Sequence, residues 1–108
     1  MKAPCEYIVK YFLPALRAVV AEGLIECYGL SETEVAKVMG LSQPAVSYYR
    51  KAKRGTKMYR IVKENRELHP LIAKLTEVLY SGDKEGARRV LKEICCLARD
   101  IGLIPLRE

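Results

Sequence analysis

The segment from residue 31 to residue 54 limits the possible folds more than any other part of the chain, because it has the pattern of two short helices around one glycine. Ser31 is followed three residues later by Glu34, a capping box that satisfies backbone N–H groups where a helix begins. Gly40 can adopt the positive φ of a tight turn. We therefore expect a short helix that ends near Met39, followed by a sharp change of chain direction.

A second short helix is expected directly after this turn. Ser42 can cap it, and Pro44 lies in its first turn, where a missing N–H is harmless because that donor has no intrahelical partner. Helical spacing from Gln43 to about Lys51 divides the residues between two faces. The inward-facing residues are Ala45, Val46 and Tyr49. The outward-facing residues are Gln43, Pro44, Ser47, Tyr48 and Lys51.

This segment resembles the helix-turn-helix of Cro and the phage repressors, the xenobiotic-response-element family. The resemblance is carried by Glu34-Val35-Ala36, Gly40-Leu41-Ser42-Gln43, Ala45-Val46-Ser47 and Lys53-Arg54-Gly55. Pro4-Cys5-Glu6 and the segment 13–18 further resemble a group of archaeal predicted transcriptional regulators, which extends the resemblance to about residue 60. It implies an all-α bundle of the lambda-repressor-like type that binds specific double-stranded DNA with the second helix in the major groove.

The distribution of charge agrees with a nucleic-acid partner. The chain has a net charge of +6, yet the stretch from Val35 to Lys63 contains eight Lys or Arg and no Asp or Glu. This basic stretch lies on and directly after the second helix, where the phosphates of a duplex would run. Helix–turn–helix pairs also occur in proteins that never bind DNA. The outer face favours DNA, because it carries hydrogen-bonding side chains suited to base edges and phosphates.

Individual residues can be assigned expected roles on this basis. We expect base contacts from Gln43, Ser47 and Tyr48, because an amide can pair bidentately with adenine and the other two share its face. We expect contacts to the DNA backbone from Ser42, Arg50, Lys51, Lys53, Arg54 and Lys57, and further hydrogen bonds from Tyr59. We therefore expect the chain to be a transcriptional regulator and not an enzyme. We expect no cofactor, and the sequence does not identify an effector ligand.

The composition suits one compact all-α domain. The 108 residues are half apolar, and alternating β-branched residues between turn pairs are missing. The chain has no run of about 18 apolar residues, and its start lacks the apolar core of a secretory signal, so we expect a cytoplasmic protein without a membrane span. Residues 1–60 should form the helix-turn-helix region, and residues 61–108 a C-terminal helical hairpin packed on it.

The flanking segments predict helices with core-facing sides. Pro14 should break or kink a helix near Leu13, and a new helix to about Cys27 should pack under the DNA-reading pair. Downstream, an apolar helix over 68–79 and a longer one ending at Gly102 should form the hairpin. Because two-fold operators mirror two-fold proteins, we expect residues 66–104 to form or support a homodimer interface; the alternative is that they only complete the core.

The four cysteines give a weak signal for metal or redox chemistry. No Cys-x-x-Cys pair is present, and where relatives of the archaeal type carry a second cysteine this chain has Ala98. We expect Cys5, Cys27 and Cys95 to be small core residues and Cys96 to lie on a basic helix face. His69, alone before a proline, should be a surface residue at a helix boundary.

Two alternatives to a DNA-binding regulator remain open. One is an antitoxin or adaptor that binds a protein partner through the C-terminal helices, for which an exposed apolar groove would be the favourable observation. The other is a redox- or metal-sensing regulator that uses cysteine, in which oxidation or metal binding would change the affinity for DNA. Neither alternative removes the pair of helices around Gly40.

Overall fold

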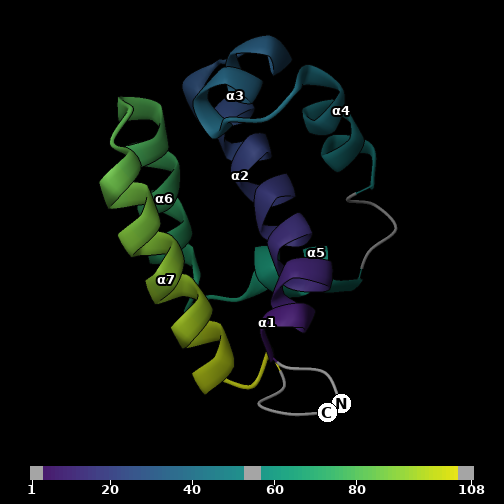
Figure 1. The fold of residues 1–108 in the computed structure, drawn as a ribbon, viewed down its shortest axis with the longest axis vertical. Coiled ribbons are helices and arrows are strands. Elements are labelled where there is room, and N and C mark those ends of the chain that lie inside the picture. Colours follow the sequence, from purple (N-terminus) through teal and green to yellow (C-terminus); the bar gives the residue numbers. More distant parts are fainter. Residues whose placement is uncertain (1–3, 53–56, 105–108) are drawn as a thin grey trace.

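The computed structural model describes residues 4–52 and 57–104 of the chain, and it is all-helical over these residues (Figure 1). Its elements are α1 (Pro4–Tyr7), the π-helical turn η1 (Ile8–Phe12), α2 (Leu13–Tyr28), α3 (Glu32–Met39), α4 (Gln43–Ala52), α5 (Lys57–Glu64), α6 (His69–Ser81) and α7 (Lys84–Asp100). The predicted all-α class is therefore confirmed. The helix α5 was not predicted, and it contains the last residues of the basic stretch.

Helix α2 is the central element of the bundle. Figure 1 shows α3 and α4 grouped around one of its ends, and the α6–α7 hairpin running along one side. Helices α4, α5 and α6 all pack directly on α2, and α3 packs on both α2 and α4. The helix that we expected beneath the α3–α4 pair thus also carries the hairpin and α5.

The predicted interruption near Leu13 takes the form of a π-helical turn. The backbone N–H of Leu13 donates to the carbonyl oxygen of Ile8, five residues back, and the residues flanking η1 keep right-handed helical dihedrals. A proline at position 14 has no N–H and would crowd the carbonyl of Lys10 in a regular α-helix. A wider turn at this place lets the chain pass the proline without separating the two helical segments.

The hairpin turn between α6 and α7 follows the prediction. Gly82 has a φ of 84°, and the side chain of Asp83 caps α7 by accepting a hydrogen bond from the N–H of Gly86 at 2.8 Å. A Cβ atom at position 86 would lie 2.3 Å from the Asp83 carboxylate. A larger residue at position 86 would therefore force the Asp83 carboxylate to shift from this position. The cap and Gly82 together fix the point where the chain reverses.

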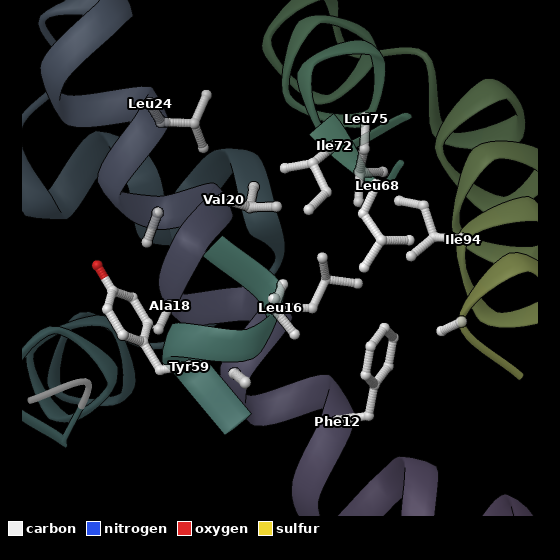
Figure 2. Packing of buried hydrophobic residues seen from close by; sticks show 14 of the residues in the cluster. Phe12, Leu16, Ala18, Val20, Leu24, Tyr59, Leu68, Ile72, Leu75 and Ile94 are labelled. Atoms are coloured by element: carbon white, nitrogen blue, oxygen red, sulfur yellow. The ribbon is translucent and has the colours of Figure 1, made fainter. Parts of the chain in front are cut away.

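One continuous hydrophobic core joins the two halves of the chain. Figure 2 shows side chains of α2 and of the hairpin pointing toward one another, with Leu16 on one side and Leu68 and Ile94 on the other. All three are 2% exposed or less, as is Phe12 at the end of η1. The apolar sides of α6 and α7 pack against α2 and against each other, so the hairpin completes the core of the bundle.

One cysteine lies elsewhere than predicted. Cys27, expected in the core, is exposed, because it lies in the last turn of α2 and borders an open depression between α2 and α6. Cys95 is half-buried and Cys96 is exposed, in agreement with the helical spacing of α7. The Cys5 side chain lies outside the described residues. His69 is exposed at the first position of α6, as expected, and its Nε2 lies 2.6 Å from the carbonyl oxygen of Lys63.

Candidate nucleic-acid interface

The turn between α3 and α4 is fixed by local hydrogen bonds. The Ser31 N–H donates to the Glu34 carboxylate at 2.9 Å and the Glu34 N–H to the Ser31 hydroxyl at 3.2 Å, so the predicted capping box is present. These bonds hold the pKa of Glu34 below its usual range. Gly40 has a φ of 70°, and the next N–H, of Leu41, reaches back to the carbonyl of Ala36 at 2.8 Å. Helix α4 therefore leaves the turn in one defined direction.

Helix α4 is held from its inner face by α2 and α3. The Ser42 hydroxyl accepts a hydrogen bond from the N–H of Ala45 at 3.2 Å, which caps the helix as predicted. Val46 is fully buried. Tyr49 is half-buried, and its hydroxyl accepts a hydrogen bond from Nη1 of Arg17 on α2 at 3.3 Å. A polar contact and an apolar contact together prevent rotation of α4 about its axis.

The outer face of α4 presents the side chains that the spacing predicted. Gln43, Pro44 and Lys51 are exposed, Tyr48 is 66% exposed, and Ser47 is half-buried. The helix contains no acidic residue, and its last turn is basic. This face therefore offers an amide, hydroxyls and a cation to a partner. Ser42, at the start of the helix, is also exposed.

The carboxylate of Glu32 on α3 contacts two side chains of α4. The sequence did not predict these contacts. Gln43 donates a hydrogen bond from Nε2 to Oε1 of Glu32 at 2.8 Å, and Arg50 forms an ion pair with Oε2 of the same residue. Residues 43 and 50 lie two helical turns apart on nearly the same side of α4, so one carboxylate can reach both. Gln43 and Arg50 are therefore both engaged with Glu32.

The predicted backbone contacts divide into described and undescribed positions. Lys51 is exposed at the end of α4, and Lys57 is exposed at the start of α5. Lys53 and Arg54, which we also expected to contact the DNA backbone, lie outside the described residues. The described cations nevertheless lie on both sides of the connection between α4 and α5, so the basic character continues from one helix to the next.

Tyr59 does not have the predicted role, because it lies between α5 and α2. Its side chain is 9% exposed, and its hydroxyl donates to Oε1 of Glu22 at 2.7 Å. Lys63, one turn later, donates to the same oxygen at 2.6 Å and to the Tyr59 hydroxyl at 3.0 Å. Desolvation and the bond to Glu22 raise the pKa of Tyr59, and hydrogen bonds to Glu22 and Tyr59 raise that of Lys63. This network fixes α5 on α2.

The described residues contain no group of three or more His, Cys, Asp or Glu side chains placed to hold a metal ion. The pKa of the Cys95 thiol is raised, first by burial and then by neighbouring Cys96. Within the same part of the chain, no helix has the length and apolar character needed to cross a bilayer.

Comparisons of the chain with protein-family models, curated proteins and solved structures gave no match. The resemblance to the Cro-like regulators therefore stays a prediction that depends on the residues quoted for it.

Proposed function

We propose that this chain binds specific double-stranded DNA sequences and regulates transcription, with α4 lying in the major groove. The observation that carries the proposal is the outer face of α4, where an amide, hydroxyls and a cation project from a helix held rigidly from behind. An α-helix fits the major groove, and these side chains can reach base edges there. The activity proposed is binding alone, without a catalytic step.

Base contact by Gln43 requires an exchange of hydrogen-bond partners. In the free protein its amide is bonded to Glu32, which also pairs with Arg50. The Arg50 and Glu32 side chains are 41% and 27% exposed, and ion pairs of this partly solvated kind contribute about 0.2–1 kcal/mol. A bidentate contact to a base is worth about 1–3 kcal/mol of discrimination. Gln43 would thus exchange a solvent-exposed hydrogen bond to Glu32 for contacts to a base edge.

Lysine and arginine side chains at the end of α4 and the start of α5 would provide the affinity that does not depend on sequence. Each phosphate neutralised by such a side chain contributes a slope of about −0.9 to the dependence of log affinity on log salt concentration. Lys51 and Lys57 are exposed and available for this role. Arg50 can join them once it leaves Glu32.

The proposal includes a homodimer on a two-fold DNA site, with half-sites about 34 Å apart. The α6–α7 hairpin leaves little apolar surface for this contact, because its large apolar side chains lie mainly in the core. Among the described residues of the hairpin, Tyr80 is the one large hydrophobic side chain that is strongly exposed, at 49%. Any dimer contact on this part of the hairpin would therefore be largely polar.

Selection of bound sequences from a random duplex pool tests the proposal. We expect a preferred site. Gln43→Ala should relax the base preference at one position of each half-site and leave the preference at the other positions unchanged. Lys51→Ala is the matched comparison, since it should weaken binding to every duplex and reduce the salt slope by about one unit. A pool without enrichment, together with no binding in dilute buffer, would reject DNA binding; two equal, uniform losses would reject base reading by Gln43.

A further inference from the structure

A hollow of about 660 Å³ lies beside α4, bordered also by α1, η1, the start of α2, α5 and the residues after α7. Its wall contains four tyrosines, Tyr7, Tyr11, Tyr48 and Tyr49. Two lysines also line it, Lys10 on η1 and Lys57 on α5, and no Asp or Glu occurs among the described lining residues. The hollow is therefore aromatic and positively charged. Tyr48 and Lys57 also belong to the DNA-binding surface proposed above, whereas the hollow itself has no role in that proposal.

The tyrosines leave ring surface in contact with water. Tyr11 is 42% exposed, and its ring centroid lies 4.9 Å from that of Tyr7 in a tilted pair. On the α4 side, the rings of Tyr48 and Tyr49 meet edge to face at 5.7 Å. The Nζ atom of Lys10 lies 5.5 Å from the centroid of the Tyr11 ring, so positive charge is held directly at an aromatic surface.

These features match the requirements of a small-molecule site. Such sites have volumes of about 300–1,000 Å³, with apolar and aromatic walls and a few polar groups that fix orientation. A planar ring stacked on the tyrosines would remove their exposed carbon surface from water. An anionic group on the same molecule would find two lysine ammonium groups without a competing carboxylate on the described wall.

We infer that this hollow binds a small anionic molecule with a planar aromatic ring, such as an aryl carboxylate or aryl phosphate. Tyr48 belongs both to this wall and to the outer face of α4. A ligand stacked on Tyr48 covers a residue expected at the DNA and brings negative charge close to the phosphates. The ligand and DNA should therefore oppose each other's binding, and by linkage the effect must be equal in both directions. Only this coupling rests on the proposed function.

Binding can be measured on the full chain, without DNA, by titration with the fluorescent probe anilinonaphthalene sulfonate, an anionic aromatic compound. Uncharged phenylnaphthylamine, which has the same rings, is the matched probe. We expect one site per chain and tighter binding of the anionic probe. Tyr11→Ala should weaken its binding about fivefold or more, through lost stacking worth about 1 kcal/mol or more. Lys10→Gln should weaken it about two- to fivefold.

Two variants outside the hollow serve as controls. Tyr80→Ala removes an exposed tyrosine from α6, and Lys92→Gln removes an exposed lysine from α7. Both should bind the probe as the original chain does, with unchanged helical circular dichroism in all four variants. Equal affinity for the two probes, or equal effects of the hollow variants and the controls, would overturn the site.

The coupling is tested by repeating a DNA titration with saturating anionic probe. We expect a weaker affinity for DNA, and Tyr11→Ala should reduce the effect. If the chain binds DNA with the same affinity in both conditions, the coupling is wrong. If the chain binds no DNA while the probe responds to Tyr11 and Lys10, the site is supported and the proposed function fails.

Discussion

Glu32 contacts the two side chains of α4, Gln43 and Arg50, that are expected to bind a base and a phosphate. Its carboxylate holds both Gln43 and Arg50 in the free protein, and it places one negative charge beside a helix that has none of its own. Neither partner was predictable from local patterns, because 11 and 18 residues separate them from Glu32. The positions of Gln43 and Arg50 on α4 followed from helical spacing, whereas their partner depended on how α3 crosses α4.

Replacing Glu32 by glutamine should strengthen binding to any duplex. The change removes a charge that repels phosphates and releases Arg50 to contact one. The slope of log affinity against log salt should therefore become steeper by about one unit. Binding should be measured by fluorescence anisotropy on an unrelated duplex over a series of salt concentrations.

Glu77→Gln is the matched control, because Glu77 is exposed on α6 and the net charge changes equally. It should leave the slope as it is. A slope for Glu32→Gln that equals the control's slope would show that Arg50 does not contact phosphate.

At the scale of elements, the local signals in the sequence predicted α3, α4, α6 and α7 with their ends. Each of these helices has a capping residue or a terminal glycine beside an apolar stripe, and such signals act within one helical turn. Helix α5 has an apolar stripe of its own at Met58, Tyr59, Ile61 and Val62, but it is short and lies within the basic stretch, so a helix was not predicted there. The basic residues around them favoured a role in DNA binding, and the partner of Tyr59 on α2, 37 residues earlier, was not visible.

The contact between α2 and α5 should make the protein sensitive to alkali. Tyr59 and Lys63 have raised pKa values in the folded state, from ordinary values of 10.0 and 10.5. The folded chain thus keeps these protons at a pH where the unfolded chain loses them. The free energy of unfolding should be constant near neutral pH and fall above about pH 10, as measured by urea unfolding across a pH series.

Variants of the network separate this effect from general alkaline unfolding. Lys63→Met and Tyr59→Phe should each make the decline above about pH 10 shallower, since each removes one of the two groups. Lys74→Met, which removes an exposed lysine on α6, should keep the original decline. If the free energy of unfolding falls equally above about pH 10 in all three variants, the network does not contribute to the pH dependence of stability.

For the molecule as a whole, the sequence predicted the all-α fold class and the α6–α7 hairpin. It did not predict which residues the hairpin packs on. The apolar stripes of α6 and α7 showed that both helices need a partner surface, and a stripe cannot specify whether that surface belongs to the same chain. The structure places Leu68, Ile94 and Phe12 in one core. Contacts between distant segments depend on packing geometry, which spacing along a single helix does not contain.

A change deep in the hairpin should therefore destabilise the DNA-reading end as well. Ile94 is fully buried, and Ile94→Ala should lower the free energy of unfolding by about 2–5 kcal/mol through lost burial and a cavity. Amide hydrogen exchange should increase for α2 and for Val46 on α4, together with α7. Protection lost in α6 and α7 alone would show that the two halves unfold independently.

The π-helical turn gives the N-terminal segment an unusual tolerance to a change in length. It accommodates one residue more than a regular helical turn, so loss of a single residue between Ile8 and Phe12 would restore ordinary helix geometry. Because both kinds of turn complete one rotation, the segment before the deletion would keep its orientation about the helix axis. Tyr7 would then stay on the wall it shares with α4, and the core from Phe12 onward would keep its register. The same one-codon deletion inside the regular helix α2 would instead rotate everything before it by about 100°.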